Sequence, residues 1–88
     1  MRLLTTSRFE RDLKRARKRG KDIGKLKTVT KRLLAGEPLP SSMRPHRLSG
    51  EWKGFHECHL EPDWLLIWHV REDALTLVRT GSHSDLFK

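Results

Sequence analysis

The sequence predicts an α+β fold in which two N-terminal helices pack on one face of a small antiparallel sheet. Two observations support this prediction. Apolar residues recur at helical spacing as far as about residue 35, and the apolar period changes to two after about residue 55. The chain has 88 residues, the length of one domain with one modest core. We therefore expect a single domain over residues 1–88.

A short strand is expected at 2–6, followed by a helix that begins at Ser7. Ser7 and Glu10 match the capping-box pattern, in which Ser is the N-cap residue and Glu follows three positions later. The narrow apolar stripe of this helix consists of Phe9, Leu13 and Ala16. The helix is expected to end at Arg19 and Gly20, because glycine favours the position after a helix.

A second helix is expected at about 22–35. Its broader apolar face consists of Ile23, Leu26, Val29, Leu33 and Leu34. Gly36 suits the position after the helix, and Pro38 and Pro40 prevent its continuation. Residues 36–50 are then expected to form a loop.

The strands are expected at 55–61, 64–71 and 74–80, joined by tight turns as an antiparallel meander. Gly81 ends the last strand, and 82–87 is expected to form a short helical turn. In the first of these strands, Cys58 and Leu60 share the face that the helices cover. The alternate residues Glu57, His59 and Glu61 are expected on the other face of the sheet, which is expected to be open and polar.

Positive charge is concentrated in the first part of the chain. The net charge is +8, with 13 Lys/Arg against 3 Asp/Glu in residues 1–36, but 6 against 8 in residues 37–88. No apolar run is long enough to cross a bilayer, and the N-terminus lacks the apolar length of a signal peptide. A single cysteine, Cys58, excludes an internal disulfide and favours a reducing, cytoplasmic location without membrane attachment.

The first helix carries seven Lys/Arg between Arg8 and Arg19, several of them as like-charge pairs four residues apart. Each such pair costs about 0.2–0.5 kcal/mol in an isolated helix, so the basic face indicates an anionic partner. RNA, including ribosomal RNA, or DNA fits this face, and an acidic protein is the alternative. The candidate docking residues are Arg11, Lys14, Arg15, Lys18 and Arg19.

Five histidines lie after residue 45, and this residue type suits RNA cleavage without a metal. A base must take the proton of the ribose 2′-OH, an acid must protonate the leaving 5′ oxygen, and a cation must steady the phosphate charge. Arg79 is a candidate for that cation. The candidates for convergence on one sheet edge are His46, His59, Asp63 and His83. Taken one at a time, each histidine also fits a structural role.

A metal site is not expected, nor is any other cofactor. His56 and His59 point to opposite faces of a strand, and the chain has no Cys-x-x-Cys and no helical His-x-x-x-His. Among the aromatic residues, Trp64 fits either the core or a base-stacking platform. Phe87 fits either an RNA contact or a hydrophobic clip onto the sheet.

Three stretches together resemble the YafQ branch of the RelE/ParE toxin superfamily. These stretches are HRLSGEWKG at 46–54, ECHLEPDWLLI at 57–67 and RTGSHSDLF at 79–87. The resemblance implies the compact α+β fold of microbial ribonucleases and a bacterial type II toxin that cleaves mRNA in the ribosomal decoding site. It also implies a cognate antitoxin as partner, and binding of operator DNA only as the toxin–antitoxin complex.

The family's catalytic positions fall on His46, His59, Asp63 and His83. The resemblance further implies an active-site aromatic residue at Phe87 and an acidic family position at Glu57. With Trp64 and Arg79, which are candidates from the residues alone, these complete the set of candidate substrate contacts. We interpret His83 as the general acid, and Asp63, or His59 oriented by Asp63, as the base. His46 and Arg79 would bind the scissile phosphate.

Two residues depart from the family pattern. His56 stands where relatives usually carry Arg, and Trp68 where they usually carry Tyr. Two other functions remain open, a basic nucleic-acid-binding module without chemistry and a ParE-like gyrase inhibitor. Neither of them needs the histidine set.

Overall fold

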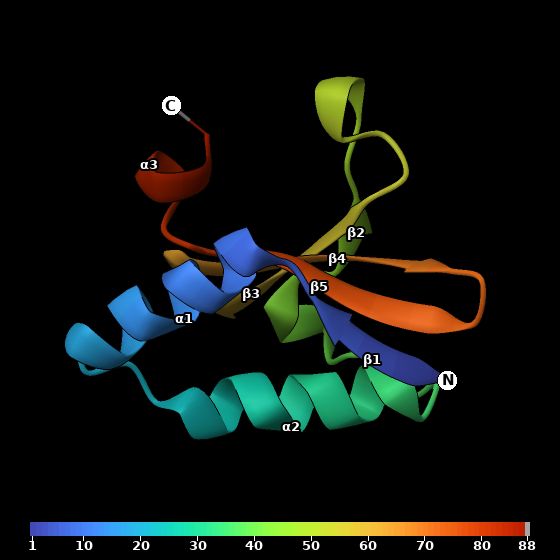
Figure 1. Ribbon diagram of the computed structural model, residues 1–88, viewed down its shortest axis with the longest axis horizontal. Coiled ribbons are helices and arrows are strands. Elements are labelled where there is room, and N and C mark those ends of the chain that lie inside the picture. Colours follow the sequence, from blue (N-terminus) through green and yellow to red (C-terminus); the bar gives the residue numbers. More distant parts are fainter. Residues whose placement is uncertain (88) are drawn as a thin grey trace.

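A five-stranded sheet carries α1 and α2 on one face, while α3 and the segment around β2 rise from the other face (Figure 1). The computed structural model describes residues 1–87. The elements are β1 (Arg2–Thr5), α1 (Ser7–Lys18), α2 (Ile23–Leu34), η1 (Ser41–Met43), β2 (His46–Arg47), η2 (Gly50–Trp52), β3 (His56–Glu61), β4 (Trp64–Arg71), β5 (Ala74–Gly81) and α3 (His83–Leu86). The predicted α+β class is confirmed.

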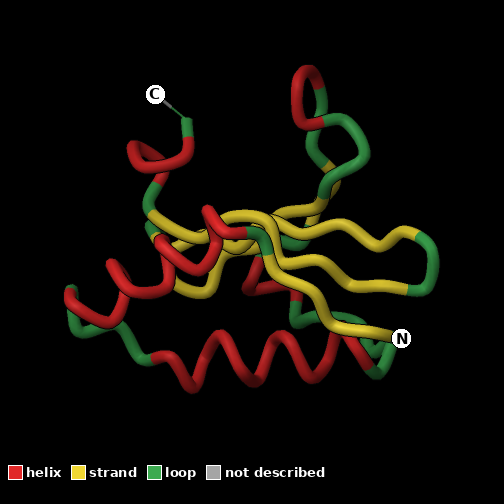
Figure 2. Tube along the Cα trace, viewed as in Figure 1, coloured by secondary structure: helices red, strands yellow, loops and turns green. Residues whose placement is uncertain are grey.

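The sheet has the strand order β1-β5-β4-β3-β2 and is mixed. β3, β4 and β5 form the predicted antiparallel meander. β1 adds to β5 in the parallel direction, so the sheet is not purely antiparallel. The stretch 36–50 also contains more structure than the predicted loop, because β2 pairs with β3 and η1 lies before it (Figure 2).

The helix boundaries agree with the sequence except at the start of α1. The N-cap is Thr6, not Ser7, because the Thr6 side chain accepts a hydrogen bond from the Phe9 amide. The same hydroxyl donates to the Val78 carbonyl at 2.7 Å, so a contact with β5 selects Thr6. Asp22 caps α2 by accepting from the Gly24 amide at 2.9 Å.

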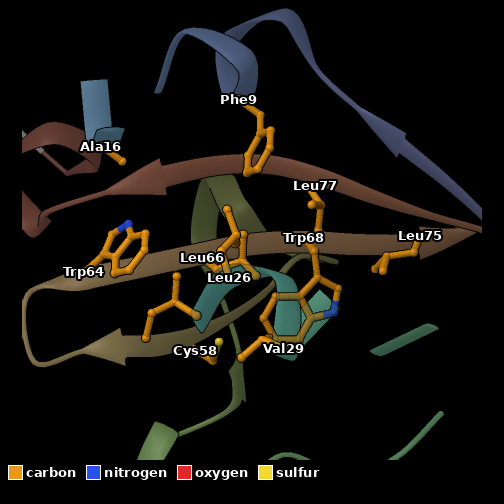
Figure 3. Packing of buried hydrophobic residues seen from close by; sticks show 11 residues of the cluster. Phe9, Ala16, Leu26, Val29, Cys58, Trp64, Leu66, Trp68, Leu75 and Leu77 are labelled. Atoms are coloured by element: carbon orange, nitrogen blue, oxygen red, sulfur yellow. The ribbon is translucent and has the colours of Figure 1, made fainter. Parts of the chain in front are cut away.

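The main core lies between the helices and the sheet, as Figure 3 shows. Phe9 and Ala16 of α1 and Leu26 and Val29 of α2 face the sheet as predicted. From the sheet, the core receives Cys58, Leu60, Trp64, Leu66, Trp68, Leu75 and Leu77. Trp64 is 1% exposed, so it belongs to the core and is not a base-stacking platform.

The opposite face of the sheet is not open, contrary to the expectation from sequence. Leu65 and Ile67 are fully buried there, together with Leu86 of α3. Their cover is completed by Leu48, Trp52, Phe55 and Val78. The run of apolar residues in β4 is therefore buried on both sides. Further along the same strand, the polar His69 and Arg71 contact Phe55 of this cluster.

A buried ion pair joins α1 to β5. Arg79 donates from Nε to Asp12 Oδ2 at 2.7 Å and from its terminal nitrogen to Oδ1 at 3.2 Å. Asp12 also accepts from the Thr80 amide at 3.1 Å. The register of β5 with β4 shifts between Leu77 and Arg79, and the ion pair holds the Arg79 side chain against α1. The Arg79 guanidinium is therefore 9% exposed and engaged by Asp12, and its role as the cation at the phosphate stays a prediction.

A second ionic contact holds α3 against α1. Asp85 accepts from the Ser82 amide at 2.9 Å, and Arg19 donates to both Asp85 oxygens at 2.7 and 3.3 Å. Hydrogen bonding to Arg19 is the main cause that holds the pKa of Asp85 well below its usual value. The carboxylate is therefore charged at neutral pH, and α3 is bound to the C-terminal end of α1.

Asp12→Ala is expected to destabilise the fold by about 3–5 kcal/mol, because it leaves the Arg79 charge buried without its partner. The measurement is urea unfolding at neutral pH. Glu10→Ala is the control, since Glu10 is exposed on the same helix and its removal is expected to cost about 0.5 kcal/mol or less.

A double variant, Asp12→Ala with Arg79→Met, removes both charges and is expected to recover most of the free energy of unfolding that the single variant loses. Two results would contradict the assigned role of the pair. One is an Asp12→Ala protein as stable as Glu10→Ala, and the other is a double variant less stable than the single one.

Candidate active site

Three segments bring His59, Asp63 and His83 together at one end of the sheet. His59 lies on β3, Asp63 lies in the turn between β3 and β4, and His83 is the first residue of α3. The imidazole centroids of His59 and His83 are 5.6 Å apart. Two of the four predicted catalytic side chains thus face each other, and a third lies against His83.

Asp63 binds His83 twice through one oxygen. Asp63 Oδ1 accepts from the His83 amide at 2.9 Å and contacts His83 Nδ1 at 2.7 Å. The backbone contact first, and the imidazole second, lower the pKa of Asp63 from its usual value. A carboxylate at Nδ1 favours the proton on that nitrogen and leaves Nε2 for proton transfer.

His59 is oriented by a different group. Its Nδ1 lies 3.2 Å from the Pro62 carbonyl oxygen, a pure acceptor, so Nδ1 carries the proton and Nε2 is free. The interpretation that Asp63 orients His59 is therefore wrong, because the Asp63 carboxylate is turned toward His83. The tight turn supplies both groups, since Pro62 and Asp63 are adjacent.

His46 and Glu57 form a neighbouring pair across β2 and β3. His46 Nε2 is 3.3 Å from Glu57 Oε1, and His46 Nδ1 is 2.8 Å from the Arg44 carbonyl. Each ring nitrogen of His46 therefore faces an oxygen atom. Glu57 is only 5% exposed, so it lies beneath His46 rather than on the open surface expected for it.

Glu61 also departs from its predicted place. A β-bulge between His59 and Glu61 changes the register of β3 with β4. Glu61 then accepts from Lys21 at 3.0 Å and from Lys25 at 2.8 Å, which are on the helix side. It contributes no free carboxylate to the site.

Phe87 follows α3 and fits both of its predicted roles at once. Its ring makes an edge contact with Trp52 at 6.1 Å, while the residue is 39% exposed. Trp52 also contacts Phe55 at 5.3 Å. An aromatic wall therefore connects α3 to the segment after β2, with the Phe87 ring accessible at its end.

A basic hollow of about 200 Å³ lies on the Asp63 side of the histidine pair. We call it the α1 hollow, and it is lined by Asp12, Arg15, Ala16, Arg19, Lys21, Asp63, Trp64, Gly81 and Ser82. Sequence reasoning missed Lys21, which lies after the end of α1. Lys21 lies three residues beyond the end of the basic helix, and nothing in the sequence shows that the fold brings it to this hollow.

The predicted docking residues divide into two groups. Arg15 contacts Asp12 at 2.9 Å and Asp85 at 3.9 Å, and Arg19 contacts Asp85, so these two guanidinium groups are paired. Arg11, Lys14 and Lys18 are exposed, and the ion pairs found among residues 1–87 do not include them. Fewer cations on this face are therefore free to bind a partner than the number of Lys and Arg residues suggests.

Within residues 1–87, His, Cys, Asp and Glu form no group of three or more that is arranged to hold a metal ion. Burial raises the pKa of the Cys58 thiol to about 12, so this cysteine is a core residue rather than a ligand or nucleophile. No helix in the described part of the chain is long and apolar enough to span a membrane.

Comparison with known proteins adds to this geometry. Residues 1–88 match the family model described as the bacterial toxin of type II toxin–antitoxin systems, YafQ. The mRNA interferase toxin YafQ of Escherichia coli K12 is 41% identical over 83 residues, which are 93% of this chain and 90% of that protein.

Solved structures agree. The E. coli DinJ–YafQ complex contains a chain with a TM-score of 0.91 and 39% identity, covering 100% of both chains. A metal-bound toxin from Helicobacter pylori has a TM-score of 0.93 and 42% identity, covering 99% of both chains. The chain therefore belongs to the YafQ family of bacterial type II toxin–antitoxin toxins.

Proposed function

We propose that this chain is a toxin that cleaves mRNA on the ribosome, in the cytoplasm, by acid–base chemistry. The observation that supports this most strongly is the facing pair of His59 and His83, each oriented through Nδ1 with Nε2 free. Relatives carry the name mRNA interferase. The alternatives, a basic binding module or a gyrase inhibitor, give no reason for two oriented imidazoles.

In the proposed reaction, His59 Nε2 takes the proton of a ribose 2′-OH. The 2′ oxygen attacks the adjacent phosphorus, and the bond from phosphorus to the 5′ oxygen of the next nucleotide breaks. His83 Nε2 gives its proton to that leaving oxygen. The products are a 2′,3′-cyclic phosphate end and a 5′-hydroxyl end, and no metal is needed for the proton balance.

Asp63 supports the acid role of His83. A carboxylate 2.7 Å from Nδ1 stabilises the imidazolium that must exist before the proton is transferred. The lowered pKa of Asp63 keeps this carboxylate charged through the physiological range. Beside the pair, His46 is a candidate to bind the phosphate, and Glu57 holds its ring in position. Phe87 is available to stack on a base.

Replacement of the acid is expected to remove most of the cleavage. His83→Ala should lower the rate by about 10²–10⁴-fold, because the 5′ oxygen then leaves without a proton donor. Asp63→Asn should cost less, since the amide oxygen still accepts from the His83 backbone. The measurement is primer extension on an mRNA translated in a cell extract.

Asp73→Asn is the matched control, because Asp73 is an exposed carboxylate in the turn between β4 and β5. It should cut like the unmodified protein. Equal cleavage by all the variants would place the chemistry elsewhere, and cleavage of the same mRNA without ribosomes would contradict ribosome dependence.

We propose that the exposed cations of α1 bind ribosomal RNA. Lys14→Gln with Lys18→Gln should raise KM and leave kcat nearly unchanged, because these side chains lie outside the histidine pair. The salt slope of ribosome binding should fall by about 0.7–0.9 for each phosphate that the variant no longer neutralises. Lys27→Gln on α2 is the control for the removal of charge, and an equal effect from it would argue against docking through α1.

We further propose that a cognate antitoxin binds this chain and that only their complex binds operator DNA. Support comes from the E. coli DinJ–YafQ complex, whose toxin chain shares this fold. Co-expression of the tagged chain with the neighbouring open reading frame should yield a stable complex without cleavage activity. Recovery of free, well-tolerated protein alone would contradict the proposal.

A further inference from the structure

A second hollow, separate from the α1 hollow, borders His59. It has a volume of about 300 Å³, the lower end of the range for small-molecule pockets. We call it the η1 hollow, and it is lined by Ser42, Met43, Arg44, His59, Leu60, Glu61 and Pro62. It forms where η1 packs against the end of β3 and the following turn. None of the residues from η1 was a candidate for the site on sequence grounds.

The lining has the composition that binds an unpaired base. Pro62 and the half-buried Met43 provide apolar surface over the core residue Leu60, and Ser42 provides a hydroxyl that donates or accepts. Proteins that read single-stranded RNA stack its splayed bases on apolar, aromatic or guanidinium surfaces and hydrogen-bond the base edges. In the η1 hollow, the guanidinium of Arg44 could both stack on a base and donate hydrogen bonds to its edge.

The charge of this hollow is positive although Glu61 lines it. Both Glu61 oxygens accept from lysine side chains, Oε1 from Lys21 at 3.0 Å and Oε2 from Lys25 at 2.8 Å. The ion pairs found within residues 1–87 leave the exposed Arg44 guanidinium unpaired. Arg44 is therefore available to a ligand, whereas Glu61 is already neutralised.

The segment 40–46, which lies between the hollow and the reaction centre, is conformationally restricted. Pro40 and Pro45 flank η1, and Arg44 has a left-handed backbone with φ of 49°. The Arg44 carbonyl accepts from His46 Nδ1 at 2.8 Å. The segment that lines the hollow thus also orients a residue of the site, so the two share one rigid frame.

The position of His59 determines which nucleotide enters. Under the proposed function, His59 takes the 2′-OH proton, so the ribose beside it belongs to the nucleotide on the 5′ side of the cut. The base is attached to the carbon next to the one that bears the 2′-OH. This base would therefore lie beside His59, which borders the hollow, and the leaving nucleotide would lie toward His83.

We propose that the η1 hollow binds the base of the RNA nucleotide immediately 5′ of the scissile phosphate, with Arg44 as its main selective contact. The proposal rests on the proposed function. It adds that base selection on this side of the cut resides in 42–44, separate from the histidine pair.

The test maps cleavage of a translated mRNA library in which all four bases occur on both sides of each site. Arg44→Asn retains a residue type that tolerates the left-handed backbone. It should lower kcat/KM by about tenfold, which corresponds to the removal of one base-stacking interaction, and should weaken the bias in the 3′-terminal base of the upstream product. The bias in the first base of the downstream product should remain.

Ser41→Ala is the matched control, because Ser41 is an exposed residue of the same η1 turn and does not line the hollow. Thermal melting establishes that each variant is folded. The proposal is overturned if Arg44→Asn keeps the original 5′ bias, if both biases weaken equally, or if the unmodified protein has no 5′ bias. Failure of the unmodified protein to cleave at all would instead overturn the proposed function.

Discussion

The buried Asp12 carboxylate is the constraint on which the geometry of the site depends. It accepts from Arg79 at 2.7 Å and from the Thr80 amide at 3.1 Å, so α1 is fixed to the C-terminal end of strand β5. The chain then passes through Gly81 to His83. A β-carbon on Gly81 would lie 2.9 Å from an Asp85 oxygen, so the first turn of α3 packs closely against Gly81 and leaves no room for a side chain there. The His83 ring reaches Asp63 because this connection is short and tied at both ends.

The same contacts explain how α1 tolerates its charge. Arg15 and Arg19 are a like-charge pair four residues apart, which is unfavourable in an isolated helix. In the folded protein both approach Asp85, at 3.9 and 2.7 Å, and Arg15 also binds Asp12. Folding therefore turns part of the repulsion into contacts between α1 and α3. Within residues 1–87, the remaining exposed cations of α1 have no ion pair that must be broken before they bind phosphate.

Sequence periodicity was sufficient for the elements that depend on local signals. The meander, both long helices and the glycine after α2 follow from apolar spacing and turn residues, and Gly36 has the expected positive φ of 71°. Residues defined by long-range partners were not predictable in this way. Thr6 is selected as a cap by a carbonyl on β5, and β2 exists only because β3 offers an edge.

For the site, alternation along β5 was not sufficient to place Arg79. The pairing of β5 with β4 shifts register between Leu77 and Arg79, which interrupts the alternation at that point. The partner of Arg79 is Asp12 on α1, and only the folded chain brings these two residues together. Likewise, the association of Asp63 with His83 rather than with the nearby His59 depends on how α3 is held, and no local pattern encodes that.

The two departures from the family pattern are in fact one feature. His56 and Trp68 are partners across β3 and β4, and their rings stack with centroids 5.6 Å apart and an interplanar angle of 13°. Burial first, and the nearby Arg47 second, lower the pKa of His56, so the stacked imidazole is uncharged at neutral pH. The neutral His56 ring packs on the buried indole of Trp68, and the positive charge that relatives carry at position 56 is absent. Arg47 and Lys53 line the same hollow as His56, so the surface there remains basic without a charge at His56 itself.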